Sequence, residues 1–207
     1  MKYLLLYVIA TALLLLTSCG PSQEPGALQQ ALAADSISAT GESLSASKKD
    51  TIWVDKTYTG MTMKQLREIY KDLEFTEEPL FAYGVDSEDN GWLLTKNKQP
   101  FIFVWSQEKS DTIHSITILS EEIVIDGNVH TGMTMGDFFR KYPSATLGID
   151  EISYDTEYAF VPGKNYSALC LTTDSTRIGA YNFSEGGPEF IKLKQPQARI
   201  QRIAIYR

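Results

Sequence analysis

The pentapeptide Thr59-Gly60-Met61-Thr62-Met63 returns further along the chain as Thr131-Gly132-Met133-Thr134-Met135. Each copy follows a β-branched run and precedes a stretch with the composition of a short helix. The glycine can take the positive φ of a tight turn, and the second threonine is a good N-cap for a helix that begins at the next methionine. In the first copy, Gln65 stands at the position that completes a capping box. We therefore expect each pentapeptide to start a helix and to serve folding rather than catalysis.

β-Branched and aromatic runs predict strands around both helices. In the first half these runs are residues 51–54, 80–83, 92–95, 101–105 and 113–119, and in the second half 122–125, 158–161, 167–172, 178–183 and 199–206. Asp89-Asn90-Gly91 is typical of a tight hairpin turn. We predict one α+β domain, residues 51–207, made of two tandem strand-helix-antiparallel meander repeats (51–120 and 121–207). Both helices are expected to pack on one face of the sheet.

Residues 1–18 have the anatomy of a secretory signal, with Lys2 followed by an apolar run from Tyr3 to Leu16. The run is shorter than the roughly 20 apolar residues that span a bilayer. Leu16-Thr17-Ser18-Cys19 resembles the lipobox of bacterial lipoproteins. In that family the signal is cut before the cysteine, which becomes an acylated N-terminus carrying chains such as palmitate. The resemblance thus implies a lipid anchor on Cys19, a location in the bacterial cell envelope, and contact with the membrane through that lipid.

Residues 19–50 contain no aromatic residue and are rich in serine, alanine and glycine. Such a stretch cannot bury enough apolar surface to offset the entropy of ordering it, so we predict a flexible tether behind the acylated Cys19. The formal net charge of the chain is −7. An acidic protein outside the cytoplasm has no electrostatic reason to bind nucleic acid, since that affinity comes mainly from lysine and arginine.

The arrangement of a glycine, an apolar residue and a capping threonine before a short helix, followed by a meander, resembles the outer-membrane-assembly lipoproteins of the SmpA/OmlA type. Those proteins usually end the helix with Gly-x-Pro, which neither copy has. Two such units in tandem also resemble the β-lactamase-inhibitor protein fold. With a lipobox ahead, the layout resembles the envelope-stress-regulated lipoprotein family of unknown function. In enteric bacteria an aspartate after the lipidated cysteine signals inner-membrane retention, and Gly20 stands here instead, which favours the outer membrane.

Residues that carry chemistry are few. His114 and His130 have no further ligand at metal-binding spacing, and no nucleophile elbow or glycine-rich phosphate loop occurs. Cys170 lies in a strand-like run without basic neighbours, which predicts a buried, inert thiol. We expect no catalytic residue, no metal and no cofactor, and therefore a protein that is not an enzyme.

Residues 101–105 are apolar at both odd and even positions, so both faces of that strand must pack against other parts of the protein. If the helices cover one face only, five aromatic residues are expected together on the other, as an open partner-binding face: Phe81, Tyr83, Trp92, Phe103 and Trp105. The alternative is a two-sided core, closed by a loop or by the second half. The first expectation favours a non-enzymatic protein-binding lipoprotein acting in assembly, inhibition or scaffolding. The second candidate function is the binding of a small apolar ligand or a glycan by the same aromatic residues.

Overall fold

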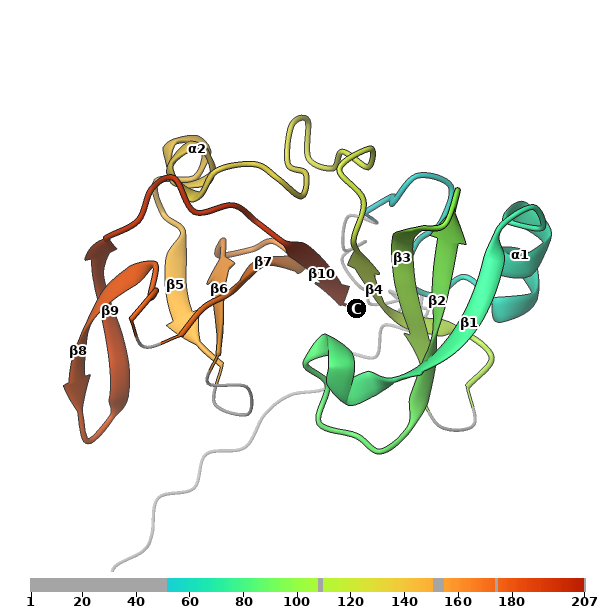
Figure 1. Cartoon of the computed structure of the whole chain (residues 1–207), viewed down its shortest axis with the longest axis horizontal. Coiled ribbons are helices and arrows are strands. Elements are labelled where there is room, and N and C mark those ends of the chain that lie inside the picture. The colour runs from blue at the N-terminus through green and yellow to red at the C-terminus, as the bar shows by residue number, and fades with distance from the viewer. Residues whose placement is uncertain (1–51, 108–109, 151–154, 174, 207) are drawn as a thin grey trace, which may run out of the picture. The chain divides into compact units, whose positions relative to one another are not determined.

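The computed structural model describes residues 52–107, 110–150, 155–173 and 175–206. The predictions for residues 1–18, for Cys19 and for the tether lie outside these residues. All the described residues belong to one compact unit with an α+β structure, in which two helices and a short 3-10 helix accompany an antiparallel sheet (Figure 1). The coarse fold class is therefore as predicted.

Eight strands form one sheet in the order β1-β2-β3-β4-β10-β7-β6-β5, and every neighbouring pair is antiparallel. The strands are β1 (Glu74–Pro79), β2 (Asn90–Lys96), β3 (Gln99–Ser106), β4 (Ile113–Ile118), β5 (Thr146–Ile149), β6 (Thr156–Phe160), β7 (Tyr166–Leu171) and β10 (Arg202–Tyr206). A separate hairpin consists of β8 (Gly179–Ser184) and β9 (Gly187–Leu193). Because β4 and β10 pair at the centre, each half of the chain supplies four neighbouring strands.

Helix α1 (Met63–Ile69) and helix α2 (Met135–Lys141) begin where the sequence predicts. Thr62 caps α1 and forms the predicted capping box with Gln65. Thr134 caps α2 by accepting a hydrogen bond from the backbone N–H of Asp137 at 3.1 Å. Each threonine satisfies a backbone donor that the helix itself leaves unpaired, which fixes the first turn.

The two copies of the pentapeptide make matching backbone hydrogen bonds. Gly60 donates to the carbonyl oxygen of Ile113, and Gly132 donates to that of Ile200, both at 2.7 Å. Each of these isoleucines donates back to the methionine that follows the glycine, at 2.8 and 2.9 Å respectively. Both glycines have a positive φ, +99° and +83°, which side-chain-bearing residues rarely adopt. The pentapeptide thus ties the start of each helix to the segment that enters the last strand of the same half.

Two of the predicted strands next to the helices are wrong. Residues 52–54 and 122–125 contribute only single bridges, Val54 with Thr57 and Ile125 with Val129, and Thr51 lies outside the described residues. The predicted strand at residues 80–83 is also wrong, because these residues form the 3-10 helix η1 (Leu80–Tyr83). A four-residue apolar run does not by itself distinguish a strand from one helical turn.

The hairpin turn predicted at residues 89–91 is wrong as well. Asn90 and Gly91 belong to β2, where they pair with the end of β1. The tight turn lies seven residues later, where Asn97 and Lys98 link β2 to β3 with φ values of +52° and +64°. Strands β1, β5 and β9 had no counterpart among the predicted ones. The β1 sequence Glu-Phe-Thr-Glu-Glu-Pro suits an exposed edge strand, which charge and proline protect from further pairing.

Alternate residues of the central strands form the main core. On one side of the sheet, here called the inner face, Ile102, Val104, Ile116, Ile118, Ile203 and Ile205 lie in register and are fully buried. Leu66 of α1 and Phe138 of α2 belong to the same buried cluster. The opposite side, here called the outer face, carries the intervening residues of each strand.

Candidate functional site

The outer face is a continuous row of side chains across both halves of the sheet. Leu93, Phe103, Thr117, Ala204, Ser167 and Phe160 lie side by side on successive strands from β2 to β6. In Figure 1 the 3-10 helix η1 lies beside the sheet, between β1 and the end of the chain. Which part of the outer face is open therefore depends on what η1 covers.

Helix η1 closes the outer face over the first half. The Tyr83 ring stacks on Phe103 with centroids 3.6 Å apart, and Phe103 is only 1% exposed. The Tyr83 hydroxyl donates to the Glu78 carboxylate at 2.6 Å, and burial together with that carboxylate raises the pKa of Tyr83. From β10, the Arg202 guanidinium donates to the carbonyl oxygen of Ala82 at 2.8 Å and lies 5.2 Å from the centre of the Tyr83 ring. The prediction of an open face is thus wrong at Phe103, because a loop folds over it.

The two tryptophans of the predicted group lie apart. Trp92 aligns with Val104, so it lies on the inner face, where it packs against the core and under the guanidinium of Arg67 at 4.4 Å. Trp105 aligns with Ser115, which places it on the outer face near the end of β3. The five predicted aromatic residues therefore do not share one face. Successive side chains of a strand point to opposite faces, and the register places Trp92 on the face opposite to Phe103 and Trp105.

Over the second half, several apolar side chains of the outer face are exposed within the part of the chain that the structure describes, and the sequence does not indicate this exposure. Leu171 is 49% exposed, Tyr206 40% and Phe160 39%, and Leu169 lies between them on β7. Phe81, at the start of η1, is 70% exposed and lines the same cavity of about 260 Å³ as Leu169 and Leu171. We call Phe81, Phe160, Leu169, Leu171 and Tyr206 the outer-face patch. The sequence signal for its apolar character is that β6 and β7 carry apolar residues at successive positions, as in Ala168-Leu169-Cys170-Leu171, so that both faces of the strand are apolar.

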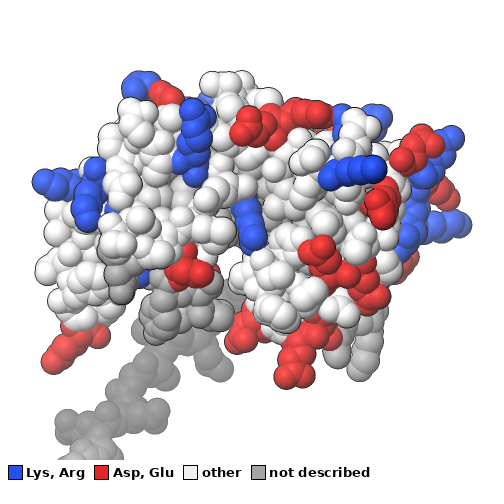
Figure 2. Space-filling model, in the orientation of Figure 1, with Lys and Arg blue, Asp and Glu red and all other residues white. Residues whose placement is uncertain are grey.

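The loop that follows η1, next to Phe81 in the sequence, is acidic. Asp86, Glu88 and Asp89 follow η1 and are exposed, and Glu78 lies on the neighbouring strand β1. Figure 2 shows acidic side chains gathered over β1 and the loop that follows η1. A partner that contacts the outer-face patch from this side would therefore meet negative charge around an apolar centre.

The side chains considered for catalysis have structural partners. Cys170 is buried, its thiol donates to the carbonyl oxygen of Arg199 at 3.2 Å, and burial together with the nearby Glu157 raises its pKa to about 12. A thiol with this pKa does not supply a thiolate at neutral pH. His130 contacts the Thr131 carbonyl oxygen at 2.7 Å, and His114 lies against the Trp105 ring. Within the described residues, no group of three His, Cys, Asp or Glu side chains could hold a metal ion.

Comparison with known proteins adds a single observation. No protein family model matches the sequence, and no curated protein does. The chain is similar to the crystal structure of the uncharacterized protein yfeY from Escherichia coli, with a TM-score of 0.44 and 14% identity, over 72% of this chain and 90% of that one. Among the described residues, neither helix has the length and apolar character needed to cross a membrane.

Proposed function

We propose that this chain is a lipid-anchored protein of the bacterial envelope that binds a protein partner through the outer-face patch and is not an enzyme. The observation that carries the proposal is exposed apolar surface along one face of the sheet. Phe81 and Leu171 line one cavity there, and Phe160 and Tyr206 flank Ser167 further along β7. Patches of this kind on soluble domains mark interaction sites. The lipobox supports the anchor, and Gly20 supports the outer membrane.

The proposal includes a finer view of the fold, in which the domain is two copies of one strand-helix-meander unit. The matching hydrogen bonds of the two pentapeptides support it. The central strand pairing supports it as well, because Ile118 pairs with Ile203 and Ile116 pairs with Ile205. A two-fold axis between β4 and β10 would convert the first of these pairs into the second. Such an axis runs perpendicular to the sheet and would put both helices on the inner face. The outer face is then the side on which a partner has access to the strands.

The partner that fits is a protein surface with apolar side chains flanked by lysine or arginine. The exposed acidic residues Asp86, Glu88 and Asp89 follow the η1 helix that carries Phe81, and opposite charge on the partner would complement them. The cavity under Phe81 holds about 260 Å³, which is below the range of about 300–1,000 Å³ that encloses small ligands. An exposed, partly aromatic surface near an acidic loop suits contact with another protein.

The test uses site-specific photo-crosslinking in cells, with the crosslinker at residue 160 and the full chain expressed. A defined partner band should disappear in Leu171→Asp and weaken when Asp86 and Glu88 are both changed to lysine. Phe183→Asp is the matched control, because Phe183 is 70% exposed, like Phe81, but lies on the β8–β9 hairpin. A band that survives Leu171→Asp, or that is lost equally in Phe183→Asp, would exclude the outer-face patch as the binding surface.

The anchor is tested separately by feeding cells an alkyne analogue of palmitate. The full chain should take up the label and partition with the outer membrane, and Cys19→Ser should do neither. Label in the variant, or a wild-type chain that stays in the soluble fraction, would refute the anchor. Neither result depends on whether the outer-face patch binds a partner.

A second candidate function is the binding of a small ligand or glycan, favoured by an open groove of about 510 Å³ between the end of α1 and residues 122–124. Its floor includes Phe101 and Ile123, and Lys56 and Asp72 stand at its edge. Saturation-transfer NMR of the full chain with a panel of glycans, compared between wild type and Phe101→Ala, would test it. Signals that do not differ between these proteins would exclude the groove.

A further inference from the structure

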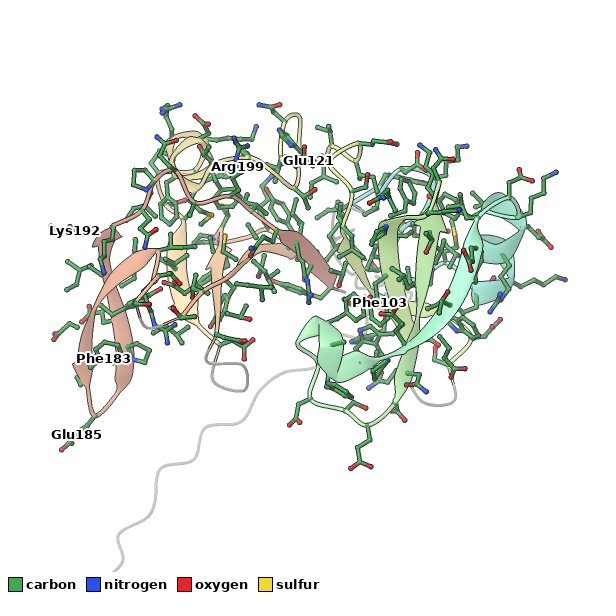
Figure 3. The ribbon with its side chains drawn as sticks, in the orientation of Figure 1. Phe103, Glu121, Phe183, Glu185, Lys192 and Arg199 are labelled. Atoms are coloured by element: carbon green, nitrogen blue, oxygen red, sulfur yellow. The ribbon has the colours of Figure 1, made fainter. Side chains whose placement is uncertain are left out.

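A cavity next to α2 is lined by cations. It has a volume of about 710 Å³ and is open to solvent, and its wall includes Arg140, Lys141 and Arg199 together with Asn128 and His130. In Figure 3 Arg199 lies on the segment that enters β10, next to α2. Three cations around one cavity are unexpected in a chain with a formal net charge of −7.

Two of the three cations have no carboxylate partner among the described ion pairs. Arg199 donates one hydrogen bond to the carbonyl oxygen of Gly132 at 2.7 Å, which fixes the guanidinium at the wall and leaves further N–H donors. Lys141 lies over the Tyr142 ring at 5.4 Å and makes no ion pair. Arg140 pairs with Asp137, which also lines the cavity.

The acidic groups at this wall are fewer than the cations. Asp137 is held by Arg140 and by the hydroxyl of Thr134 at 2.6 Å. Glu121 lies against Gly132, so closely that a Cβ on that glycine would overlap its carboxylate. Asp126 is a further carboxylate nearby, since Lys141 lies beside Gly127, but Asp126 is paired with Lys164. Among the described residues, Lys141 and Arg199 are thus the cations of this wall that have no ion-pair partner.

The first half of the chain indicates that the fold does not need these cations. When the two pentapeptides are aligned, Glu68 and Ile69 of α1 stand where Arg140 and Lys141 stand in α2. Thr112 bridges to Thr62 as Arg199 bridges to Thr134. The same backbone arrangement therefore forms in the first half with a threonine, an isoleucine and a glutamate. Only this step rests on the proposed repeat, and the cavity and its charges do not.

We propose that the cavity lined by Arg140, Lys141 and Arg199 binds a ligand through a phosphate group. Guanidinium and ammonium groups form their strongest hydrogen bonds with oxyanions, and arginine can present two parallel donors to one. The phosphate can belong to a small soluble molecule or to the headgroup of a lipid near which the chain is held. Both sources offer the same chemistry to Lys141 and Arg199.

The experiment titrates the full chain, kept in neutral detergent micelles, with inorganic phosphate and with glycerol phosphate. Binding is followed by ³¹P NMR line width and by the ring-proton shifts of His130, which report on this cavity. In a second arm the micelles contain phosphatidylglycerol or phosphatidylcholine, which distinguishes an anionic lipid headgroup from the free ion.

The variants exchange each cation for its counterpart in the first half, as Arg199→Thr and Lys141→Ile. Each should weaken phosphate binding about tenfold or more, since one charge-assisted hydrogen bond is lost. Lys192→Thr is the matched control, because Lys192 is an exposed cation on β9 away from the cavity. Backbone amide shifts far from α2 should not change, which separates loss of binding from loss of fold.

The proposal is supported if binding is weaker in both Arg199→Thr and Lys141→Ile but unchanged in Lys192→Thr. The arm in which binding is seen, free phosphate or phosphatidylglycerol, then shows whether the phosphate belongs to a soluble molecule or to a lipid. Absence of binding in both arms overturns the proposal. So does an equal loss in Lys192→Thr, because it would indicate attraction to net charge rather than to this cavity. Crosslinking at the outer-face patch is independent of all these outcomes.

Discussion

The helices that follow the two pentapeptides are alike where they face the core. Leu66 in α1 and Phe138 in α2 occupy the same helical position and are both fully buried. Each helix ends at a tyrosine whose hydroxyl donates to an aspartate with a positive φ, Tyr70 to Asp55 and Tyr142 to Asp126. These shared contacts tie the end of each helix to the turn that precedes its pentapeptide.

The same helices differ where they face outward. Arg67 of α1 covers Trp92, with its guanidinium 4.4 Å from the ring centre. At the matching position α2 has Phe139, whose ring lies 5.6 Å from Phe190 of β9. The second half can therefore dock the β8–β9 hairpin, whereas the first half ends in a charged surface. Positions common to both halves stabilise the fold, and positions that differ give each half its own surface.

Among the variants that compare the two halves, removal of the shared core residues should cause the largest loss in the free energy of unfolding. Phe138→Ala should lower the free energy of unfolding by about 3–5 kcal/mol and Leu66→Ala by about 2–5 kcal/mol, because each leaves a cavity in one common core. Urea unfolding followed by tryptophan fluorescence and by far-UV circular dichroism should give a single transition in both variants. Two separated transitions would mean that the halves unfold independently.

The β8–β9 hairpin belongs to the second half alone, since β3 and β4 of the first half are linked by residues 107–112. The buried Glu157 carboxylate accepts hydrogen bonds from the backbone N–H groups of Ile178 and Gly179 and from the hydroxyl of Tyr181, at 2.7, 3.0 and 2.6 Å. Glu157→Ala should cost about 2–3 kcal/mol, because buried donors lose a charged acceptor. Hydrogen exchange should accelerate most in β8 and β9 and least in β1 to β4. Uniform acceleration would contradict a local anchoring role.

The pentapeptide glycines allow a direct comparison of the halves. Gly60→Ala should cost about 1–2 kcal/mol, since an alanine is strained at its φ of +99° and nothing else lies near the added methyl group. Gly132→Ala should cost slightly more, because the methyl group must also displace the Glu121 carboxylate, which can move at a small cost at the end of an exposed, flexible side chain. Thermal unfolding of both variants measures the difference. Restoration of the Gly132→Ala variant to the level of Gly60→Ala by Glu121→Ala would confirm the cause, and no restoration would contradict it.

Local chemistry explains which parts of the structure could be predicted. The helix starts at Thr62 and Thr134 follow from capping, which depends on neighbouring residues only, and most central strands follow from their β-branched runs. The face on which Trp92 lies depends on strand register, and its sequence neighbours do not specify that register. The cover on Phe103 depends on η1, which Arg202 holds from the far end of the chain.

The candidate surfaces were harder to predict than the fold. Leu171 and Phe160 are exposed because no described helix or strand packs over them, and no local sequence pattern specifies this. The cation-lined cavity joins residues of α2 to Arg199, which are far apart in the sequence. In both cases tertiary contacts, rather than the residues alone, create the site.

The smallest expected effect concerns the aspartates at the helix ends. Asp126 accepts hydrogen bonds from Tyr142 and Tyr166, at 2.5 and 3.0 Å, and pairs with Lys164 at 2.9 Å. Burial alone would raise the pKa of Asp126, but these donors outweigh it and lower the pKa. The folded pKa is then below the unfolded value of about 3.9, so the carboxylate stabilises the fold above about pH 4. That contribution is lost as the pH falls through the folded pKa.

Asp126→Asn should therefore destabilise the protein at neutral pH by about 1 kcal/mol or less, and the difference from wild type should shrink as the pH falls below about 4. Urea unfolding at a series of pH values measures both quantities, with Asp55→Asn, which removes the matching carboxylate of the first half, as the comparison. A difference that stays constant with pH would mean that the Asp126 carboxylate acts through shape rather than charge. In that case the Tyr142–Asp126 contact would stabilise the second half in the same way as the Tyr70–Asp55 contact stabilises the first. The additional partners of Asp126, Tyr166 and Lys164, would then add nothing to the free energy of unfolding.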